Sequence, residues 1–415
     1  MLTYKQFLAF LAVGFLVFSC SESSEVISDQ EELSKDVVPG QYIVVFDEGA
    51  ISTGRASEPQ FVDRGEKMRY TASRIAQVNN QIDGFLEEGI LDAGQVQGRY
   101  TSIFAGFTAT LSNDEVSRLE SDPRVAIVEQ DRMITLDVEV EQVFTAEEFE
   151  KDRPGGRTQA QTTTCAINNA GGFTNGAGSN TFLWIVDTGI DLDHPDLNVN
   201  TQFSRAFRDG NPDDSNGHGT HVAGIAAAVN NSIGVVGVSA GAQVVAIDVL
   251  GSGSAPTSTI INGMDFIAAN DIAGDVVNMS LGPRNRTGCS SGSSYRLALE
   301  RLNDQSRVAL AAGNSADNAA FYDPACQNLT GVYTVASMTC SGAFSSFSNF
   351  GTPPVDWIAT GSSVTSTYRG GRYATLSGTS MASPVVAGIL HSRNSAPVQC
   401  GSVSYRGQSY RIACR

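Results

Sequence analysis

Three short segments, far apart in the chain, each carry one chemically active side chain beside glycine. Asp187 ends the apolar run 182–186, His218 has a glycine on each side, and Ser380 follows a Gly-Thr pair at the start of an apolar stretch. A serine hydroxyl attacks a carbonyl only when a base removes its proton, and that base needs an acid that fixes its tautomer. The residues therefore predict nucleophilic catalysis, with Ser380 as nucleophile, His218 as base and Asp187 as the orienting acid.

Asn314 supplies a fourth element of the same chemistry. It follows the apolar run 308–312 and a glycine, so its side-chain amide is expected at the end of a buried strand. An amide there can donate a hydrogen bond to the oxyanion that forms during acyl transfer, and losing such a donor costs roughly 3–4 kcal/mol. The start of a helix at Ser380 would add backbone N–H groups and a favourable dipole.

The elements that position these residues alternate between strands and helices from about residue 165 onward. Continuous apolar strands separated by helices indicate a parallel sheet covered on both faces, a three-layer α/β fold. Catalytic groups in such folds gather at the carboxyl ends of the strands. The predicted strands are 182–186, 243–249, 276–279 and 308–312, and the predicted helices lie near 219–229, 256–270 and 293–305.

Residues 40–136 have the pattern of a separate, small α+β domain. Strands and helices follow one another in a β-α-β-β-α-β-like order, which indicates a ferredoxin-like module with helices on one sheet face. Residues 137–164 are predicted to be a linker, because they show little apolar periodicity. The predicted strands of the module are 41–46, 104–111 and 125–130, and its predicted helices are 66–88 and 113–119.

Four motifs of the second unit resemble the subtilase family, with the proteinase K branch nearest. They are Ile185–Asp191, Asn216–Ile225, Ala311–Ser315 and Gly378–Ile389, and the resemblance spans roughly 165–391. It implies a subtilisin-like catalytic domain over 165–415. It also implies a secreted serine endopeptidase that cleaves proteins or peptides through an acyl-enzyme, without an organic cofactor.

Residues 40–136 resemble the inhibitor-type propeptide of the same family. The resemblance implies a folding chaperone and intramolecular inhibitor, whose end lies in the active-site cleft until the chain cuts itself within 137–164. The alternative is an unrelated α+β domain. A catalytically silent binding protein is the alternative function, although Asp187, His218, Ser380 and Asn314 fill all four catalytic positions.

Substrate-binding residues follow from the resemblance too. Ser280, Leu281 and Gly282 are similar to the edge strand that lines the first specificity pocket and pairs with substrate backbone. Ala311, Ala312 and Gly313 are similar to the opposite wall. Neither segment contains an acidic residue, which implies a broad preference for apolar or aromatic side chains before the cleaved bond.

Asp356 resembles a calcium ligand of the proteinase K branch, completed by carbonyls near Thr330 and Val332. A solvated loop carboxylate is the alternative. His221 forms a potential metal pair with His218, and a metal-dependent hydrolase would use it, but we expect its ring to pack inside. We expect residues 191–196 to form a structural loop and not a cation site.

Seven cysteines leave six beyond Cys20, an even set that indicates up to three disulfides among 15 possible pairings. Short loops favour Cys326–Cys340 and Cys400–Cys414, leaving Cys165–Cys289. The segment 400–414 is expected to be a clamped hairpin in place of the family's further helical segment. Without that segment, the helix at Ser380 would have less support than usual.

The first 20 residues have the pattern of a signal peptide, with one lysine and a short apolar core. Val17-Phe18-Ser19-Cys20 resembles a lipobox, which would anchor the precursor through Cys20; an ordinary secretory signal is the alternative. An acidic spacer, 21–39, follows. Residues 1–149 carry a net charge of −15 and residues 150–415 a net charge of −2. Neither half is basic, which argues against nucleic acid as a partner, and we expect a monomer.

Overall fold

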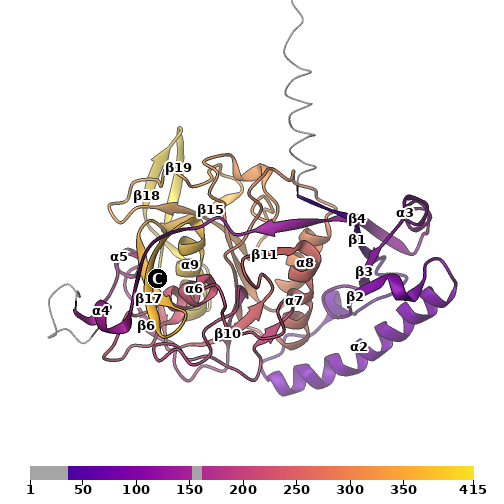
Figure 1. Ribbon diagram of the computed structural model, residues 1–415, viewed down its shortest axis with the longest axis horizontal. Helices are drawn as coiled ribbons and strands as arrows, with labels where there is room; N and C mark the ends of the chain where they lie inside the picture. The colour runs from indigo at the N-terminus through magenta and orange to yellow at the C-terminus, as the bar shows by residue number, and fades with distance from the viewer. Residues whose placement is uncertain (1–35, 152–160) are drawn as a thin grey trace, which may run out of the picture.

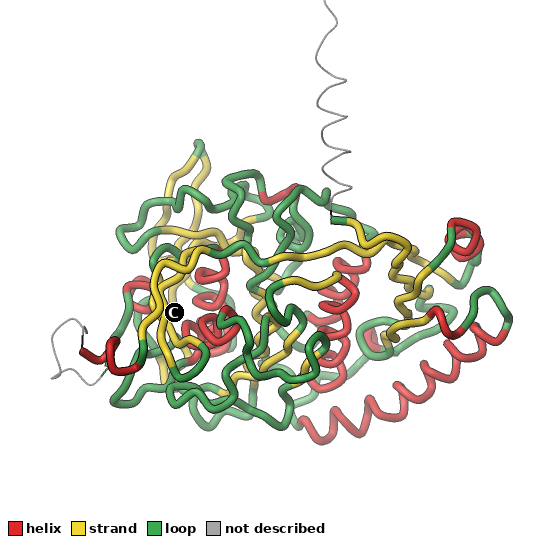
Figure 2. The backbone as a smooth tube through the Cα atoms, viewed as in Figure 1, coloured by secondary structure: helices red, strands yellow, loops and turns green. Residues whose placement is uncertain are grey.

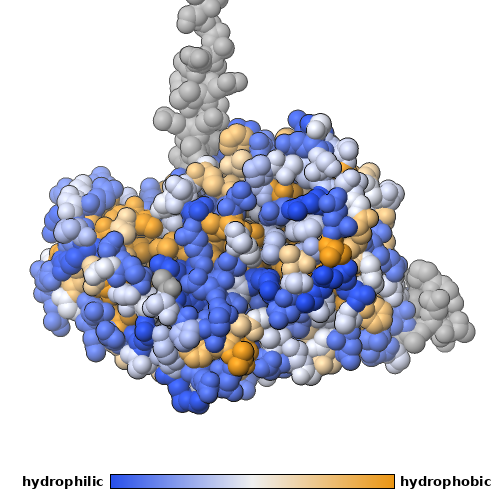
Figure 3. Space-filling view, turned by 180° about the vertical axis from the view of Figure 1, so that it is seen from behind, coloured by the Kyte–Doolittle hydropathy of each residue, from blue (hydrophilic) through white to orange (hydrophobic). Residues whose placement is uncertain are grey.

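The computed structural model describes residues 36–151 and 161–415, which form a small domain and a large one (Figure 1). The expected signal peptide, Cys20 and most of the acidic spacer lie outside the described residues. So does the segment 152–160 of the expected linker. None of the described helices is long and apolar enough to cross a membrane. Seen from behind, hydrophilic and hydrophobic residues are interspersed over the surface, and the hydrophobic ones gather in small patches (Figure 3).

The small domain is an antiparallel sheet with its helices on one face (Figure 2). Its strand order, β4-β1-β3-β2, confirms the ferredoxin-like prediction. The core contains residues from both helices and from β1 and β3. Strand β2 was not predicted, because five residues with a central glycine carry little apolar signal. The elements are β1 (Val37–Phe46), α2 (Arg64–Glu87), β2 (Val96–Tyr100), β3 (Gly106–Thr110), α3 (Asn113–Glu120) and β4 (Val125–Thr135).

The large domain is built on a sheet in which the described residues form nine strands, ordered β18-β19-β15-β14-β13-β12-β7-β10-β8. The pairs from β15 to β8 are all parallel. The strands are β7 (Phe182–Asp187), β8 (Arg205–Ala206), β10 (Gln243–Asp248), β12 (Val276–Met279), β13 (Arg307–Ala311), β14 (Val332–Met338), β15 (Val355–Thr360), β18 (Val398–Tyr405) and β19 (Gln408–Cys414).

Helices cover both faces of this sheet. Along β7, Leu183 and Ile185 contribute to one core cluster, whereas Phe182, Trp184 and Val186 contribute to another. The first cluster contains residues of α6 (His218–Ala227) and α9 (Thr379–Arg393), and the second contains residues of α7 (Thr257–Asn270) and α8 (Ser294–Leu302). Because successive side chains of a strand point to opposite faces, this alternation confirms the three-layer prediction.

Part of the expected linker is not a linker. Residues of β5 (Glu139–Phe144) pair antiparallel with β17 (Arg372–Ser377), the second strand of a hairpin with β16 (Val364–Tyr368). A short helix, α4 (Ala146–Lys151), follows. The side chains of β5 are mostly exposed. Backbone hydrogen bonds to β17 form this strand, so its sequence carries no apolar pattern that would predict it.

The remaining short elements connect the two domains or frame the large one. Strand β11 of the large domain pairs with β4 of the small domain and so extends its sheet. The pair β6–β9 is parallel. These elements are α5 (Cys165–Asn169), β6 (Thr174–Asn175), β9 (Ser239–Ala240) and β11 (Ser254–Pro256). Three short 3₁₀ helices are Arg55–Ser57, Ala93–Gln95 and Ala319–Phe321.

The disulfides correct two of the three expected pairings. The bonds are Cys165–Cys340, Cys289–Cys326 and Cys400–Cys414. The prediction from loop length is therefore correct only for Cys400–Cys414, in the C-terminal hairpin. Cys165 begins α5, and Asn169 of that helix donates a hydrogen bond to the Cys340 carbonyl oxygen (3.1 Å), so folding brings these two segments together across 175 positions.

The C-terminal hairpin forms as expected, with Arg406 (φ 48°) and Gly407 (φ 77°) as its turn. The hairpin is closed by its disulfide and also extends the large sheet, because β19 pairs with β15. Helix α9 is buried from Thr379 to His391, so the expectation of a poorly supported helix is wrong. The end of the chain also contacts α5, since the Arg415 backbone N–H donates to the Ala170 carbonyl oxygen (3.0 Å).

Candidate active site

Asp187 and His218 meet at the carboxyl end of β7. His218 Nδ1 lies 2.7 Å from Asp187 Oδ1, and both side chains are buried. The Thr188 backbone N–H donates to the same carboxylate oxygen (2.8 Å). A Cβ on Gly219 would lie 2.0 Å from the Gly189 carbonyl oxygen. The glycine after His218 therefore lets α6 approach the turn that follows Asp187.

Ser380 lies in the first turn of α9. It lines a pocket with Leu136 and Asp137, whereas His218 lines another with Leu136 and Val138. Its hydroxyl donates to the Ser280 carbonyl oxygen (3.1 Å), and the Ser280 hydroxyl donates to the Ser380 carbonyl oxygen (2.8 Å). Within the described residues, His218 Nε2 has no hydrogen-bond partner. The imidazole nitrogen that would accept the serine proton is therefore free to do so.

Asn314 follows β13 and a glycine, as expected, and its amide is held in a fixed direction. Its Oδ1 accepts hydrogen bonds from the Thr379 backbone N–H (2.8 Å) and hydroxyl (2.9 Å). Gly313 has φ +101° and donates its N–H to the same hydroxyl (3.0 Å). The Asn314 Nδ2 group then donates to the Asp137 carbonyl oxygen at 2.5 Å. A backbone carbonyl of the chain itself thus occupies the position expected for an oxyanion.

The polypeptide before Asp137 lies between two segments of the large domain. Ile134 and Thr135 pair antiparallel with β11, and the Leu136 N–H donates to the Gly253 carbonyl oxygen (2.9 Å). On the other side, the Arg284 guanidinium donates to the Leu136 carbonyl oxygen (2.8 Å). The sequence analysis missed β11 and Arg284, since a three-residue strand and a single loop arginine give no recognisable pattern.

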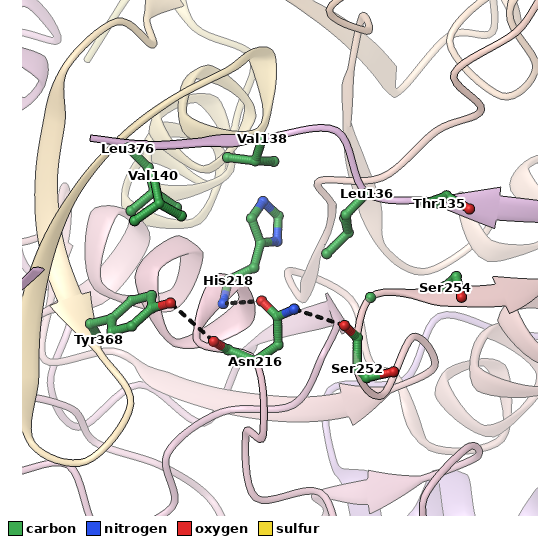
Figure 4. Close-up of a pocket in the computed structure, with 11 residues that line it drawn as sticks. Thr135, Leu136, Val138, Val140, Asn216, His218, Ser252, Ser254, Tyr368 and Leu376 are labelled. Atoms are coloured by element: carbon green, nitrogen blue, oxygen red, sulfur yellow. Dashed lines mark hydrogen bonds between the residues drawn. The ribbon is translucent and has the colours of Figure 1, made fainter. Parts of the chain in front are cut away.

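The polypeptide after Asp137 continues across the site as β5. In Figure 4 the His218 ring lies between Leu136 and Val138, beneath the segment that connects β4 to β5. These side chains, together with Asn216 and Tyr368, line an open cavity of about 410 Å³. Asp137 lines a neighbouring pocket together with Ser380, whereas Val138 lines this cavity together with His218, so the Asp137–Val138 bond joins the surroundings of the candidate nucleophile to those of the candidate base.

The residues expected to form the specificity pocket surround a small pocket of about 20 Å³ beside Ser380. Ser280, Leu281, Gly282 and Gly313 line it as predicted. Ala312 does not line it, since its residue is buried on the sheet and its N–H donates to the Val335 carbonyl oxygen.

Ala311, expected in the same wall, does line the pocket. The Asp137 carboxylate is half-exposed and lies 3.5 Å from the half-exposed Arg284 guanidinium.

Three carboxylates strengthen the contact between the two domains. Asp131 Oδ1 accepts from the Ser258 backbone N–H (3.1 Å) in the first turn of α7, and Glu129 Oε2 accepts from the Ser294 N–H (2.7 Å) at the start of α8. Negative charge is favourable at both helix N-termini. In the reverse direction, Asp265 Oδ1 accepts from the backbone N–H groups of residues 101–103, at 2.7 to 3.0 Å.

Burial opposes ionisation of two of these carboxyl groups. It raises the pKa of Asp131, and it raises the pKa of Asp265 to about 6 although three N–H groups favour the charged form.

His221 packs inside, as expected. Its Nε2 lies 3.0 Å from the carbonyl oxygens of Val364 and Ala374, and burial lowers its pKa to about 3. The described residues contain no group of three or more His, Cys, Asp or Glu side chains placed to hold a metal. In the loop 191–196, His194 Nε2 lies 3.0 Å from the Arg372 carbonyl oxygen, which is a structural contact.

Asp356, the expected calcium ligand, is a partly buried carboxylate near the start of β15, next to β14. Its Oδ2 accepts from the Thr334 N–H (2.9 Å), and burial raises its pKa to about 6, although Arg411 nearby favours the charged form. The Thr330 carbonyl oxygen accepts from the Asn303 amide (2.7 Å) and keeps a second lone pair. Calcium prefers oxygen ligands of this kind, so these groups fit the ion.

Comparisons with known proteins agree with this geometry. Residues 178–393 match the model of the Subtilase family, and residues 41–137 match that of Peptidase inhibitor I9. Alkaline serine exoprotease A of Vibrio alginolyticus is 33% identical over 88% of this chain and 65% of its own length. Subtilisin amylosacchariticus of Bacillus subtilis subsp. amylosacchariticus is 38% identical over 71% of each chain. The chain thus spans about two thirds of the length of these relatives.

A crystal structure of a cold adapted subtilisin-like serine proteinase is 36% identical and covers 53% of this chain and 76% of its own, with a TM-score of 0.47. The family matches cover the residues that build the site, from β7 through α9, and the whole small domain. The chain belongs to the subtilase family of serine endopeptidases and carries an I9-type inhibitor domain before its catalytic domain.

Proposed function

We propose that this protein is an exported, self-inhibited precursor that becomes active by hydrolysing its own Asp137–Val138 bond with Ser380, His218 and Asp187. One observation carries the proposal: the Asn314 amide donates a hydrogen bond to the carbonyl oxygen of that bond. The small domain, which we call the propeptide, ends in the cleft.

The reaction requires the Ser380 hydroxyl to change its hydrogen-bond partner. When its hydroxyl leaves the Ser280 carbonyl and turns to His218 Nε2, the ring takes the proton while Oγ attacks the Asp137 carbonyl carbon. Asn314 Nδ2 and the Ser380 backbone N–H stabilise the oxyanion. His218 then gives the proton to the Val138 nitrogen, and the C–N bond breaks. Water attacks the acyl-enzyme with His218 again as base, which releases the Asp137 carboxylate.

The cleaved propeptide inhibits because its end occupies the substrate position. The segment 133–136 fills the same edge contacts, with β11 on one side and Arg284 on the other, that an extended substrate would use. Its sheet and loops add contacts to α7 and α8 that do not depend on the cleft. Inhibition therefore outlasts the cleavage step.

For other substrates we propose a broad preference for apolar or aromatic side chains before the cleaved bond. Leu281, Gly282, Ala311 and Gly313 line the pocket, and none of them carries charge. The chain's own Asp137 carboxylate is half-exposed and faces Arg284, so it makes little use of this apolar wall.

The N-terminal sequence supports export, and Cys20 supports a lipid anchor on the precursor. Because that anchor belongs to the propeptide, cleavage after Asp137 would release the catalytic domain into the medium. Mature enzyme that stays in the membrane fraction after complete processing would contradict the release.

The test is a Ser380→Ala precursor compared with the wild-type protein. We expect the variant to remain one intact chain, and the wild type to yield a catalytic fragment whose N-terminal residue is Val138, by intact mass and N-terminal sequencing. A fluorophosphonate should label Ser380 of the processed wild type. A folded, processed protein that takes no label would support the silent binding protein instead.

A further inference from the structure

Two arginines of the propeptide, Arg55 and Arg64, insert into the catalytic domain far from the cleft. Arg64 contacts Phe182, the first residue of β7, whereas the catalytic Asp187 is the last residue of the same strand. Five steps of a strand span roughly 16 Å. Arg64 therefore binds at the amino end of β7, whereas the catalytic Asp187 lies at its carboxyl end.

Arg64 occupies a complete guanidinium site. Its Nη1 and Nη2 groups donate to both carboxylate oxygens of Asp275 (2.8 and 3.0 Å). They also donate to the carbonyl oxygens of Asn270 (2.7 Å) and Asn180 (3.1 Å). The guanidinium carbon lies 3.6 Å from the centroid of the Phe182 ring. Only arginine has the planar fork that binds both carboxylate oxygens at once, and its flat guanidinium can also stack on the Phe182 ring.

The catalytic domain itself holds the Asp275 carboxylate in place. The Trp184 indole N–H and the Phe182 backbone N–H each donate to it at 2.8 Å, and the Ile272 N–H donates at 3.2 Å. Its side chain is fully buried, and burial raises its pKa while Arg64 opposes the shift. The catalytic domain thus supplies three N–H donors to this carboxylate, and Arg64 supplies its counter-charge.

Arg55 occupies a second site, formed around Asp271, which lies four residues before Asp275. It donates to both oxygens of Asp271 (3.1 and 3.0 Å) and to the carbonyl oxygens of Ala268 and Arg301 (both 2.9 Å). The Ser306 hydroxyl, from the catalytic domain, donates to the same carboxylate (2.9 Å). Both members of the ion pair are at most 1% exposed.

We propose that Asp271 and Asp275 form a guanidinium-binding exosite of the catalytic domain. The exosite holds the cleaved propeptide through Arg55 and Arg64, and once vacated it accepts arginine side chains of other polypeptides. The exosite proposal rests on the proposed function in one respect: the propeptide must be cleaved from the catalytic domain and then dissociate from it. Removing one partner of a buried ion pair leaves the other charge uncompensated, so the vacated carboxylates favour a new guanidinium.

The first experiment measures how fast the cleaved propeptide leaves the processed complex, by dilution and the rise of activity on a small chromogenic substrate. Arg64→Ala and Arg64→Lys should each release it at least 10-fold faster than wild type. The matched control is Arg99→Ala, because Arg99 pairs with Asp83 inside the propeptide. Equal release rates for the Arg64 and Arg99 variants would overturn the proposal.

The second experiment avoids any folding defect of the variants. Released wild-type catalytic domain, blocked at Ser380 with a phosphonate, is titrated calorimetrically with a synthetic peptide of residues 51–72. We expect binding that weakens at least 10-fold when both arginines of the peptide become lysine. Equal affinity of the two peptides, or no binding of either, would contradict the exosite. A chain that never processes itself would fail earlier, as one intact band, which separates this outcome from failure of the proposed function.

Discussion

The side-chain amide of Asn314 donates a 2.5 Å hydrogen bond to the carbonyl oxygen of Asp137, a residue 177 positions away. The same amide accepts two hydrogen bonds from Thr379, immediately before Ser380. One side chain thus connects the candidate scissile carbonyl to the start of the helix that carries the candidate nucleophile. This relationship is the basis for proposing the Asp137–Val138 bond as the one that is cut.

Replacing Asn314 by alanine should slow acyl transfer and leave substrate binding nearly unchanged. The donor matters most when the oxygen becomes negative, so kcat should fall roughly 10²- to 10³-fold with little change in KM. Self-cleavage should slow by a similar factor, which time courses on gels would show. The control is Asn303→Ala, whose amide donates to the Thr330 carbonyl oxygen outside the site. A variant that processes itself at the wild-type rate would remove Asn314 from the mechanism.

Replacing Glu141 by alanine should open the side of the cleft that follows the scissile bond. Its carboxylate accepts from the hydroxyls of Ser363 (3.0 Å) and Ser377, which fasten β5 to β17. After cleavage, the processed variant should hydrolyse peptides that extend beyond the cleaved bond several-fold faster than wild type. A chromogenic substrate that ends at the cleaved bond should show no difference.

The control for this strand is Glu147→Ala, because Glu147 is an exposed residue of the neighbouring helix α4. If Glu141→Ala changed the rates on both substrates equally, β5 would not be what limits access.

Asp265 should make the precursor relatively more stable in acid. Burial raises the pKa of its carboxyl from 3.8 to about 6 in the folded protein. The protonated form is thus favoured by the fold, and this group's contribution is complete below about pH 4 and is lost as the pH rises through 6. The difference in unfolding free energy between the Ser380→Ala precursor and its Asp265→Asn derivative should shift by about 2–3 kcal/mol between pH 4 and pH 7.

Denaturant titrations at the two pH values would measure this difference. Other carboxyl groups titrate alike in both proteins and cancel. A difference that does not change with pH would show that Asp265 has an ordinary pKa in the folded precursor.

Calcium should raise the melting temperature of the mature enzyme through Asp356. A bound ion would compensate the buried carboxylate, and a concentration 100 times Kd would stabilise by about 2.7 kcal/mol. Asp356→Asn should lose this response, whereas Asp193→Asn, which removes an exposed carboxylate, should keep it. Scanning calorimetry with calcium or with chelator measures the effect. An equal response in wild type and Asp356→Asn would place the ion elsewhere.

The sequence predicted the elements that are marked by strong local patterns. Buried strands such as β7 read as continuous apolar runs, and the glycines around His218 correspond to a close approach that the structure shows directly. The order of the propeptide elements was also recoverable, except for β2. Local periodicity is sufficient where a segment's own side chains decide its structure.

Features decided by backbone pairing or by distant contacts were not predictable. Strand β5 has exposed side chains and forms only because the edge of β17 is available. Cys165 pairs with Cys340 because α5 packs there, which no loop length reveals. The roles of Arg284 and of the two arginines of the exosite depend on hydrogen-bond partners more than 100 residues away in the sequence.

The contact between α5 and the C-terminal hairpin has a consequence for local opening of the catalytic domain. Helix α5 is tied to Cys340 by a disulfide, and the Arg415 backbone N–H donates to the Ala170 carbonyl oxygen just after α5. Strand β19, immediately before Arg415, also pairs with β15 of the large sheet. Neither segment can open without disturbing the other. Proteolysis of these two segments by neighbouring active copies should therefore follow the rate of global unfolding.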